Sequence, residues 1–153
     1  MKKIKEYITE KFKINSKTAK QHYNYCPENT KELKELINKM IDKHGINANL
    51  NNIDVSKITD MTKLFGYSKF NGDISQWDVS NVTNMHEMFI GSKFNGDISE
   101  WDVSNVTDMT RMFSFCLYEQ DLSKWKINNH AIINDIFKNN PKLQKNPPKW
   151  YKK

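Results

Sequence analysis

Apolar residues recur with a period of 24 between residues 46 and 141. Four units of equal length, 46–69, 70–93, 94–117 and 118–141, follow one another without an insertion. When the units are aligned, positions 1, 5, 8, 10, 13, 16, 19 and 20 are apolar in every unit, with His130 as the exception. One such unit cannot bury its apolar side chains alone, whereas stacked neighbours can. The periodicity therefore predicts four stacked units that share a continuous core.

The spacing within a unit predicts its local structure. Positions 8 and 10 alternate with polar residues, as in a half-buried strand. Positions 16, 19 and 20 have the i, i+3, i+4 spacing of one helical face. Asn84 and Glu87 fit a capping box before that face, and Asn71-Gly72 is a turn signal between units. Each unit is thus predicted to contain one short strand, one short helix and tight turns, which makes an α/β solenoid.

The segment before the repeats has the features of a helical cap. Asn29 and Glu32 fit a capping box, and Gly45 provides a C-terminal stop. Between them, residues 30–44 carry one apolar helical stripe, formed by Leu33, Leu36, Ile37, Met40 and Ile41. Residues 3–12 carry a second, shorter stripe. We therefore expect residues 1–45 to be an N-terminal α-helical capping region, followed by the four repeats at 46–141.

The chain ends in a basic, Pro-containing tail at residues 142–153. Pro147 and Pro148 favour polyproline II and bar a helix. Repeat four departs from the pattern of its neighbours, as terminal units do. Trp150 and Tyr151 are expected to fold back on that last repeat.

A family resemblance rests on the repeat motif itself. Units two and three share FNGDIS-x-WDVSNVT-x-M-x-x-MF, which resembles the BspA-like leucine-rich repeats over residues 46–137. The resemblance implies a short right-handed leucine-rich-repeat-like array with a parallel sheet on one side. It also implies adhesion to host or matrix proteins, because the family is known mainly from bacterial surface proteins. The chain shows no secretory signal peptide, lipid-attachment cysteine or long array, and so looks more like small intracellular members from low-GC bacteria, phages or mobile elements.

Charge is distributed unevenly along the 153 residues. The net charge is +6, yet residues 46–141 hold 8 basic against 12 acidic residues. Residues 1–45 hold 11 lysines against 6 acidic residues, and the tail holds 5 lysines and no acid. Because the acidic middle of the chain would repel a phosphate backbone, a nucleic acid could contact only the basic termini. Arg111 is the only arginine, which disfavours a protein that reads bases.

The residue types that carry enzyme chemistry are sparse. Cys26 and Cys116 are too few for a disulfide scaffold and are expected to be structural thiols. The four histidines have no second ligand at metal spacing. No nucleophile elbow, phosphate loop or dinucleotide fingerprint is present. The tryptophans at position 8 lie on the same side of the predicted strand as the apolar residues at position 10. We therefore expect them to belong to the core and not to a stacking platform for bases or sugars. We expect no enzyme activity, no cofactor and no metal.

Two columns of aspartates suggest two interpretations, a calcium site or a series of turn caps. Position 4 holds Asp73, Asp97 and Asp121, and position 9 holds Asp54, Asp78 and Asp102. Aspartate ladders bind calcium in glycine-rich nonapeptide repeats, but that glycine pattern is absent here. Aspartate side chains that cap turns explain the columns more simply.

The remaining candidate for a functional surface is the set of polar residues that alternate with the apolar residues at positions 8 and 10. Positions 7, 9 and 11 are expected to face solvent and to bind a protein partner, with a plain solvated surface as the equal alternative. The partner-binding candidates are Gln76, Asp78, Ser80, Glu100, Asp102, Ser104, Lys124 and Lys126. We expect a cytoplasmic, non-enzymatic protein-binding module, an inhibitor or adaptor acting on a host protein, as a monomer or small homo-oligomer away from membranes. The alternatives are RNA association through the basic termini, or a surface adhesin if the chain is secreted.

Overall fold

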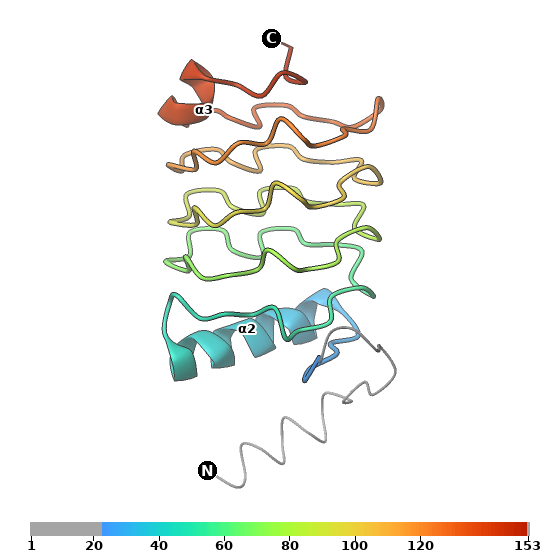
Figure 1. Cartoon of the computed structure of the whole chain (residues 1–153), viewed down its shortest axis with the longest axis vertical. Helices are drawn as coiled ribbons and strands as arrows, with labels where there is room; N and C mark the ends of the chain where they lie inside the picture. The colour runs from blue at the N-terminus through green and yellow to red at the C-terminus, as the bar shows by residue number, and fades with distance from the viewer. Residues whose placement is uncertain (1–22, 153) are drawn as a thin grey trace, which may run out of the picture.

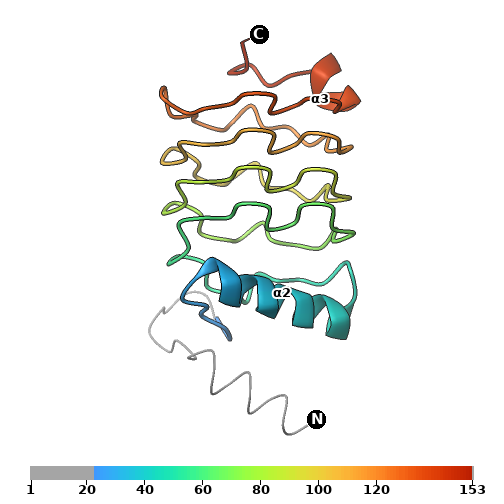
Figure 2. The same ribbon diagram turned by 180° about the vertical axis from the view of Figure 1, so that it is seen from behind.

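The repeat units lie one above the other, with a helix at each end of the stack (Figure 1). The computed structural model describes residues 23–152, so the predicted stripe at residues 3–12 lies outside the described residues. Helix α2 spans Thr30–His44 and α3 spans Pro141–Lys145. Seen from behind, α2 runs along the first repeat, and the coils succeed one another from there to α3 (Figure 2).

The units themselves contain neither of the expected elements. In residues 23–152 the structure has no strand, and its two helices lie at the ends of the repeat array. In place of a sheet, neighbouring segments are joined by individual backbone hydrogen bonds and by isolated parallel bridges, namely Tyr25–Ile53, Asn49–Asp73, Asp60–Asn84, Asn84–Asp108 and Asp108–Ile132. The predicted α/β solenoid of strand–helix units is therefore wrong, and so is the leucine-rich-repeat architecture that the resemblance implied.

Hydrogen bonding explains why positions 16 to 22 are not helical. In unit one, the amide of Leu64 donates to the Met61 carbonyl at 3.1 Å, which closes a tight turn. The amides of Met61 and Lys63 instead donate to carbonyls of the next unit, at 2.8 and 3.0 Å. A helix needs the i−4 carbonyl for each of these donors. Lys63 and Tyr67 adopt left-handed φ values of 53° and 57°, which also end helical propagation.

The first half of each unit is likewise a series of turns. In unit two, the amide of Trp77 donates to the Ile74 carbonyl at 3.2 Å, and the amide of Val82 donates to the Val79 carbonyl at 2.9 Å. The polar and apolar alternation at positions 7 to 11 is thus a short extended step between two turns. Because these turns use amides that a strand would pair across the sheet, no regular ladder forms.

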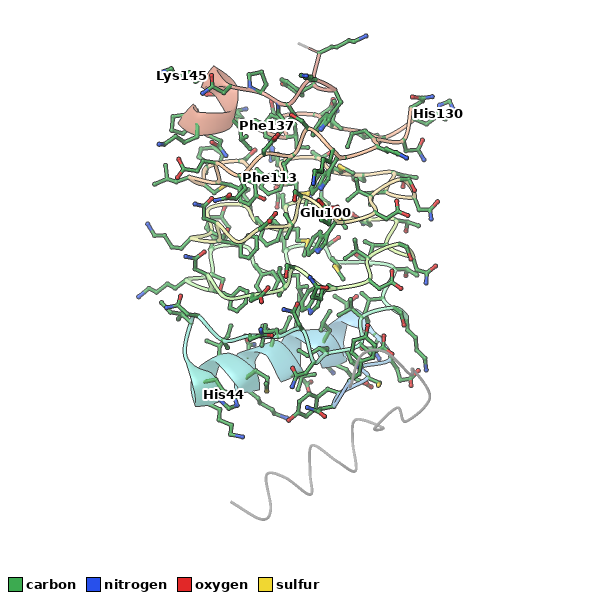
Figure 3. The ribbon with its side chains drawn as sticks, in the orientation of Figure 1. His44, Glu100, Phe113, His130, Phe137 and Lys145 are labelled. Carbon is green, nitrogen blue, oxygen red and sulfur yellow. The ribbon has the colours of Figure 1, made fainter. Side chains whose placement is uncertain are left out.

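Most residues of the predicted core columns are buried, whereas Ile46 at position 1 is 46% exposed and Ile127 and Ile133 are partly buried. Phenylalanines at position 20 stack along the array, with ring centroids 5.6 Å apart for Phe65–Phe89 and for Phe89–Phe113. Phe113 and Phe137 follow one another in the interior, whereas His130 projects from the edge of the stack (Figure 3). The expectation that the tryptophans belong to the core is confirmed. Each indole N–H donates to a carbonyl of the preceding unit, as from Trp101 to Ile74 at 3.2 Å.

Helix α2 forms for the reasons visible in its sequence. The Asn29 side chain accepts from the Glu32 amide at 3.0 Å, and the Glu32 carboxylate accepts from the Glu28 amide at 3.1 Å. Gly45 ends the helix with φ 86°, and its amide donates to the Ile41 carbonyl. The predicted helix at 30–44 is confirmed, and most of its apolar stripe is buried against the first repeat.

Side chains of α2 replace the backbone donors that a preceding unit would supply. The Thr30 hydroxyl donates to the Asp60 carbonyl at 2.5 Å, and the Lys34 amine donates to the Thr62 carbonyl at 3.1 Å. One unit further on, the equivalent carbonyls accept backbone amides. Helix α2 therefore satisfies two backbone carbonyls of the first unit in addition to covering its apolar surface.

The C-terminal segment closes the other end. Asn140 is buried, and its side chain accepts from the amides of Lys142 and Leu143 to start α3. The Trp150 ring stacks on Trp125 at 6.4 Å, and its indole N–H donates to the Leu122 carbonyl at 2.7 Å. The expectation that the end of the chain folds back on the last repeat is confirmed.

Candidate protein-binding surface

The eight predicted partner-binding residues occupy positions 7, 9 and 11 of units two to four, and this set is here called the ladder face. Its residues stand 24 apart in neighbouring units, so they form three rows across the stack. The charged and amide side chains are exposed and the two serines are half-buried. The rows are Gln76, Glu100 and Lys124; Asp78, Asp102 and Lys126; and Ser80 and Ser104. Unit one does not extend the surface in the expected way, because Asp54 is buried. The backbone amide of Asp54 donates to the carbonyl of Tyr25.

The two aspartates of the ladder face also shape the backbone beneath them. Oδ1 of Asp102 accepts from the amide of Ser104 at 3.1 Å and from its hydroxyl at 2.6 Å. These two hydrogen bonds hold the pKa of Asp102 below its usual range, and the bond from the Ser104 hydroxyl has the larger effect. Asp78 has the same arrangement with Ser80. A negative charge at either position is therefore both structural and exposed.

The charge of the ladder face changes sign along the stack. Glu100 is exposed and forms an ion pair with Lys124 of the next unit. Lys126 lies close enough to Asp102 to contribute to the lowering of its pKa. The acidic half of the surface thus belongs to units two and three, and the basic half to unit four.

The other aspartate column also consists of turn caps. Oδ1 of Asp73, Asp97 and Asp121 accepts from the amide two residues later, at 2.8 to 2.9 Å. This confirms the interpretation of these carboxylates as turn caps. Within residues 23–152, no group of three or more histidine, cysteine or carboxylate side chains is placed to hold a metal ion.

The thiols and histidines show no nucleophilic arrangement in the part of the chain that is described. Cys116 is buried, and burial raises the pKa of its thiol, against the opposing effect of hydrogen bonds that include the Asn140 side chain. A thiol with a raised pKa is a poor nucleophile. His86 lies 3.7 Å from carboxylate oxygens of both Glu87 and Asp108. These contacts belong to an ion-pair network around Glu87, whose side chain is buried although its partners are largely exposed.

Sequence reasoning missed that network at position 18. Lys63, Glu87, Arg111 and Asp135 occupy this position in successive units and alternate in charge. Glu87 lies 3.0 Å from the Lys63 amine and 3.5 Å from the Arg111 guanidinium. Arg111 also lies 3.7 Å from Asp135. The alternation of charge at a fixed position in the repeat was the signal that could have revealed this ladder.

A second missed feature is an exposed apolar corner at positions 22 and 24. Tyr67, Phe115 and Leu117 are 74%, 53% and 62% exposed. The same positions hold Gly91 or Asn139, and Lys69 or Lys93, in other units. Apolar residues at positions that neighbouring repeats keep small or polar were the available signal.

Comparison with known proteins identifies the family but no solved or curated counterpart. None of the helices in residues 23–152 has the length and apolar character needed to cross a membrane. No curated protein and no solved structure matches the chain. A family model described as "Mycoplasma protein of unknown function, DUF285" matches residues 31–150, which include α2, all four repeats and most of the C-terminal segment. The chain therefore belongs to the DUF285 family of Mycoplasma proteins of unknown function.

Proposed function

We propose that this chain is a non-enzymatic protein-binding module that uses the ladder face. The observation that carries the proposal is the separation of roles within each unit. The apolar columns are almost entirely buried in the core, while positions 7 and 9 present charged side chains in fixed rows. Rows whose charge changes from acidic in units two and three to basic in unit four, on a rigid support, favour a complementary protein surface. An inhibitor or adaptor that acts on a host protein, within the cytoplasm, fits such a module.

We further propose that the repeat motif is of the BspA-like type at the level of sequence. The shared WDVSNVT and MxxMF segments support this kinship. The adhesin role known for those surface proteins would apply if the chain is secreted. RNA association through the basic termini is the other alternative, and the experiment below separates it from protein binding.

The test is affinity capture from a lysate of the source organism, followed by mass spectrometry. The variant combines Glu100→Lys with Lys126→Glu, which makes the row of position 7 basic and the row of position 9 acidic and leaves the net charge unchanged. Neither side chain caps a turn. The matched control combines Asp42→Lys with Lys43→Glu at exposed positions of α2.

The proposal predicts that the ladder-face variant loses its partner and that the α2 variant retains it. Nuclease treatment should not release the partner. If the ladder-face variant still captures the same protein while alanines at Lys145, Lys149 and Lys152 abolish capture, the tail is the binding element and the proposal is wrong. Release by nuclease would favour the RNA alternative.

A further inference from the structure

A pocket opens at the corner of the stack, away from the ladder face. Its volume is about 390 Å³, and its walls come from unit two, from the junction of units three and four, and from the start of α3. We call it the corner pocket, and the residues that matter to its chemistry are Lys93, Phe115, Leu117, Glu119 and Lys142. This size lies at the lower end of the range for ligand pockets in proteins, about 300–1,000 Å³.

The apolar wall of the corner pocket is maintained at a cost in backbone energy. Phe115 adopts φ 58°, a left-handed conformation that is unfavourable for a bulky side chain. Unit two meets the same requirement with Gly91, at φ 60°, and unit four meets it with Asn139, at φ 53°. Asparagine and glycine adopt this conformation readily. Phe115 is half exposed, so core packing does not offset the strain. Unit one carries Tyr67 here, at φ 57°, so the left-handed turn is a requirement of the repeat. What distinguishes Phe115 is that it meets this requirement with a large apolar side chain that lines the corner pocket together with Leu117.

The charges of the corner pocket are not balanced. Lys142 lies 2.8 Å from Glu119, and their hydrogen bond holds the pKa of Glu119 below its usual range. Lys93 is exposed and has no ion-pair partner among residues 23–152. Lys69 holds the equivalent position one unit earlier and is exposed as well. An incoming carboxylate would therefore meet an unpaired amine beside an apolar wall.

We propose that the corner pocket binds an acidic segment of a partner protein. An apolar side chain of that segment enters against Phe115 and Leu117, and a neighbouring carboxylate contacts Lys93. Single-stranded nucleic acid fits less well, because such sites combine a basic groove with several stacking aromatics. The corner pocket offers one aromatic ring, one aliphatic side chain and an internal carboxylate. This inference does not depend on the ladder face, which lies on other positions of the repeat.

The direct test is an NMR titration of the full chain with defined probes. The first probe is a capped hexapeptide with a Leu-Phe centre and two aspartates on each side. The second replaces the aspartates by lysines, and the third is an oligouridylate. We expect saturable shifts of the amides of residues 91–93 and 115–117 with the acidic peptide, and none with the other two. Shifts in these residues with the basic peptide or with the oligouridylate would overturn the proposal, as would the absence of saturable shifts with the acidic peptide.

Variants separate binding from folding. Phe115→Asn installs the residue that unit four carries at this position, and Leu117→Ser removes the second apolar side chain. Together they should weaken binding of the acidic peptide at least fivefold without lowering the melting temperature. Ile132→Ser is the matched control, because Ile132 is an exposed apolar residue that does not line the corner pocket.

Two further comparisons complete the test. Lys93→Glu should also weaken binding at least fivefold, because it removes the unpaired amine. The ladder-face variant and Ile132→Ser should bind the acidic peptide like the wild type, so failure here is distinguishable from failure of the proposed function. Wild-type affinity in the Phe115→Asn, Leu117→Ser variant would overturn the assignment.

Discussion

Replacing Trp150 with alanine tests whether the C-terminal segment is an energetic cap. The ring stacks on Trp125 and also contacts Phe137, with centroids 6.4 and 5.9 Å apart. Its indole N–H supplies the Leu122 carbonyl with the same donor that the tryptophan of a following repeat would supply. In the array, Trp101 does this for Ile74, and Trp125 does it for Ile98.

The magnitude follows from what the substitution removes. Truncating a buried aromatic side chain costs about 3–5 kcal/mol, and Trp150 is half-buried. We therefore expect a loss of about 2–3 kcal/mol in the free energy of unfolding, including about 1 kcal/mol for the lost hydrogen bond. For a chain of this size, each kcal/mol moves the melting temperature by about 2–4 °C. The expected fall is thus about 4–12 °C by these two relations.

The assay is thermal and urea denaturation followed by circular dichroism. Trp150→Phe keeps the ring contact and removes the N–H, so it should lose only the hydrogen-bond share, about 1 kcal/mol. Lys149→Ala, at an exposed neighbouring position, should be neutral. If Trp150→Ala melts at the wild-type temperature, the C-terminal segment lies on the array without stabilising it, and the cap interpretation is refuted.

Three further predictions concern the charges of the array. Glu87→Lys should lower the free energy of unfolding by about 2–3 kcal/mol, because it places a cation between Lys63 and Arg111, whereas Glu87→Gln should lower it by about 1 kcal/mol. Equal melting temperatures for the two variants would show that the ion pairs at position 18 do not stabilise the array. Folding lowers the pKa values of five carboxylates, namely Asp73, Asp97, Asp102, Asp121 and Glu87, so the unfolded chain binds more protons and stability should be lost as the pH falls from about 5 to 2. A melting temperature that stays constant across that range would show that the hydrogen bonds and ion pairs of these carboxylates do not stabilise the fold. Millimolar calcium should leave the melting temperature unchanged, because Oδ1 of Asp73, Asp97 and Asp121 is engaged in turns, and a rise that chelator reverses would reveal a cation site.

The features that were predictable from sequence depend on local or purely apolar information. Helix α2 has its cap, its stripe and its stop within 17 consecutive residues, from Asn29 to Gly45. The core columns depend only on which side chains avoid water, and a period of 24 identifies them whatever the backbone does between them.

The local conformation of the repeats could not be read in the same way. Three apolar positions at 16, 19 and 20 fit a helix, but they fit a series of tight turns equally well. The choice is made by partners in the next unit, such as the His86 carbonyl that accepts the amide of Lys63. The corner pocket escaped for a related reason, since positions 22 and 24 vary between units and Phe115 has no periodic signature.

The alternating ladder at position 18 constrains how such a chain can lengthen during evolution. Units two and three are identical at 16 of 24 positions and share their apolar columns, so unequal recombination within the gene can duplicate either one without disturbing the core. Copying unit two alone would set two copies of Glu87 beside each other, and copying unit three alone would do the same with Arg111. Copying both together preserves the order of acid and base along the whole edge. The ladder therefore favours growth by pairs of repeats, an even step of 48 residues, over growth by single ones.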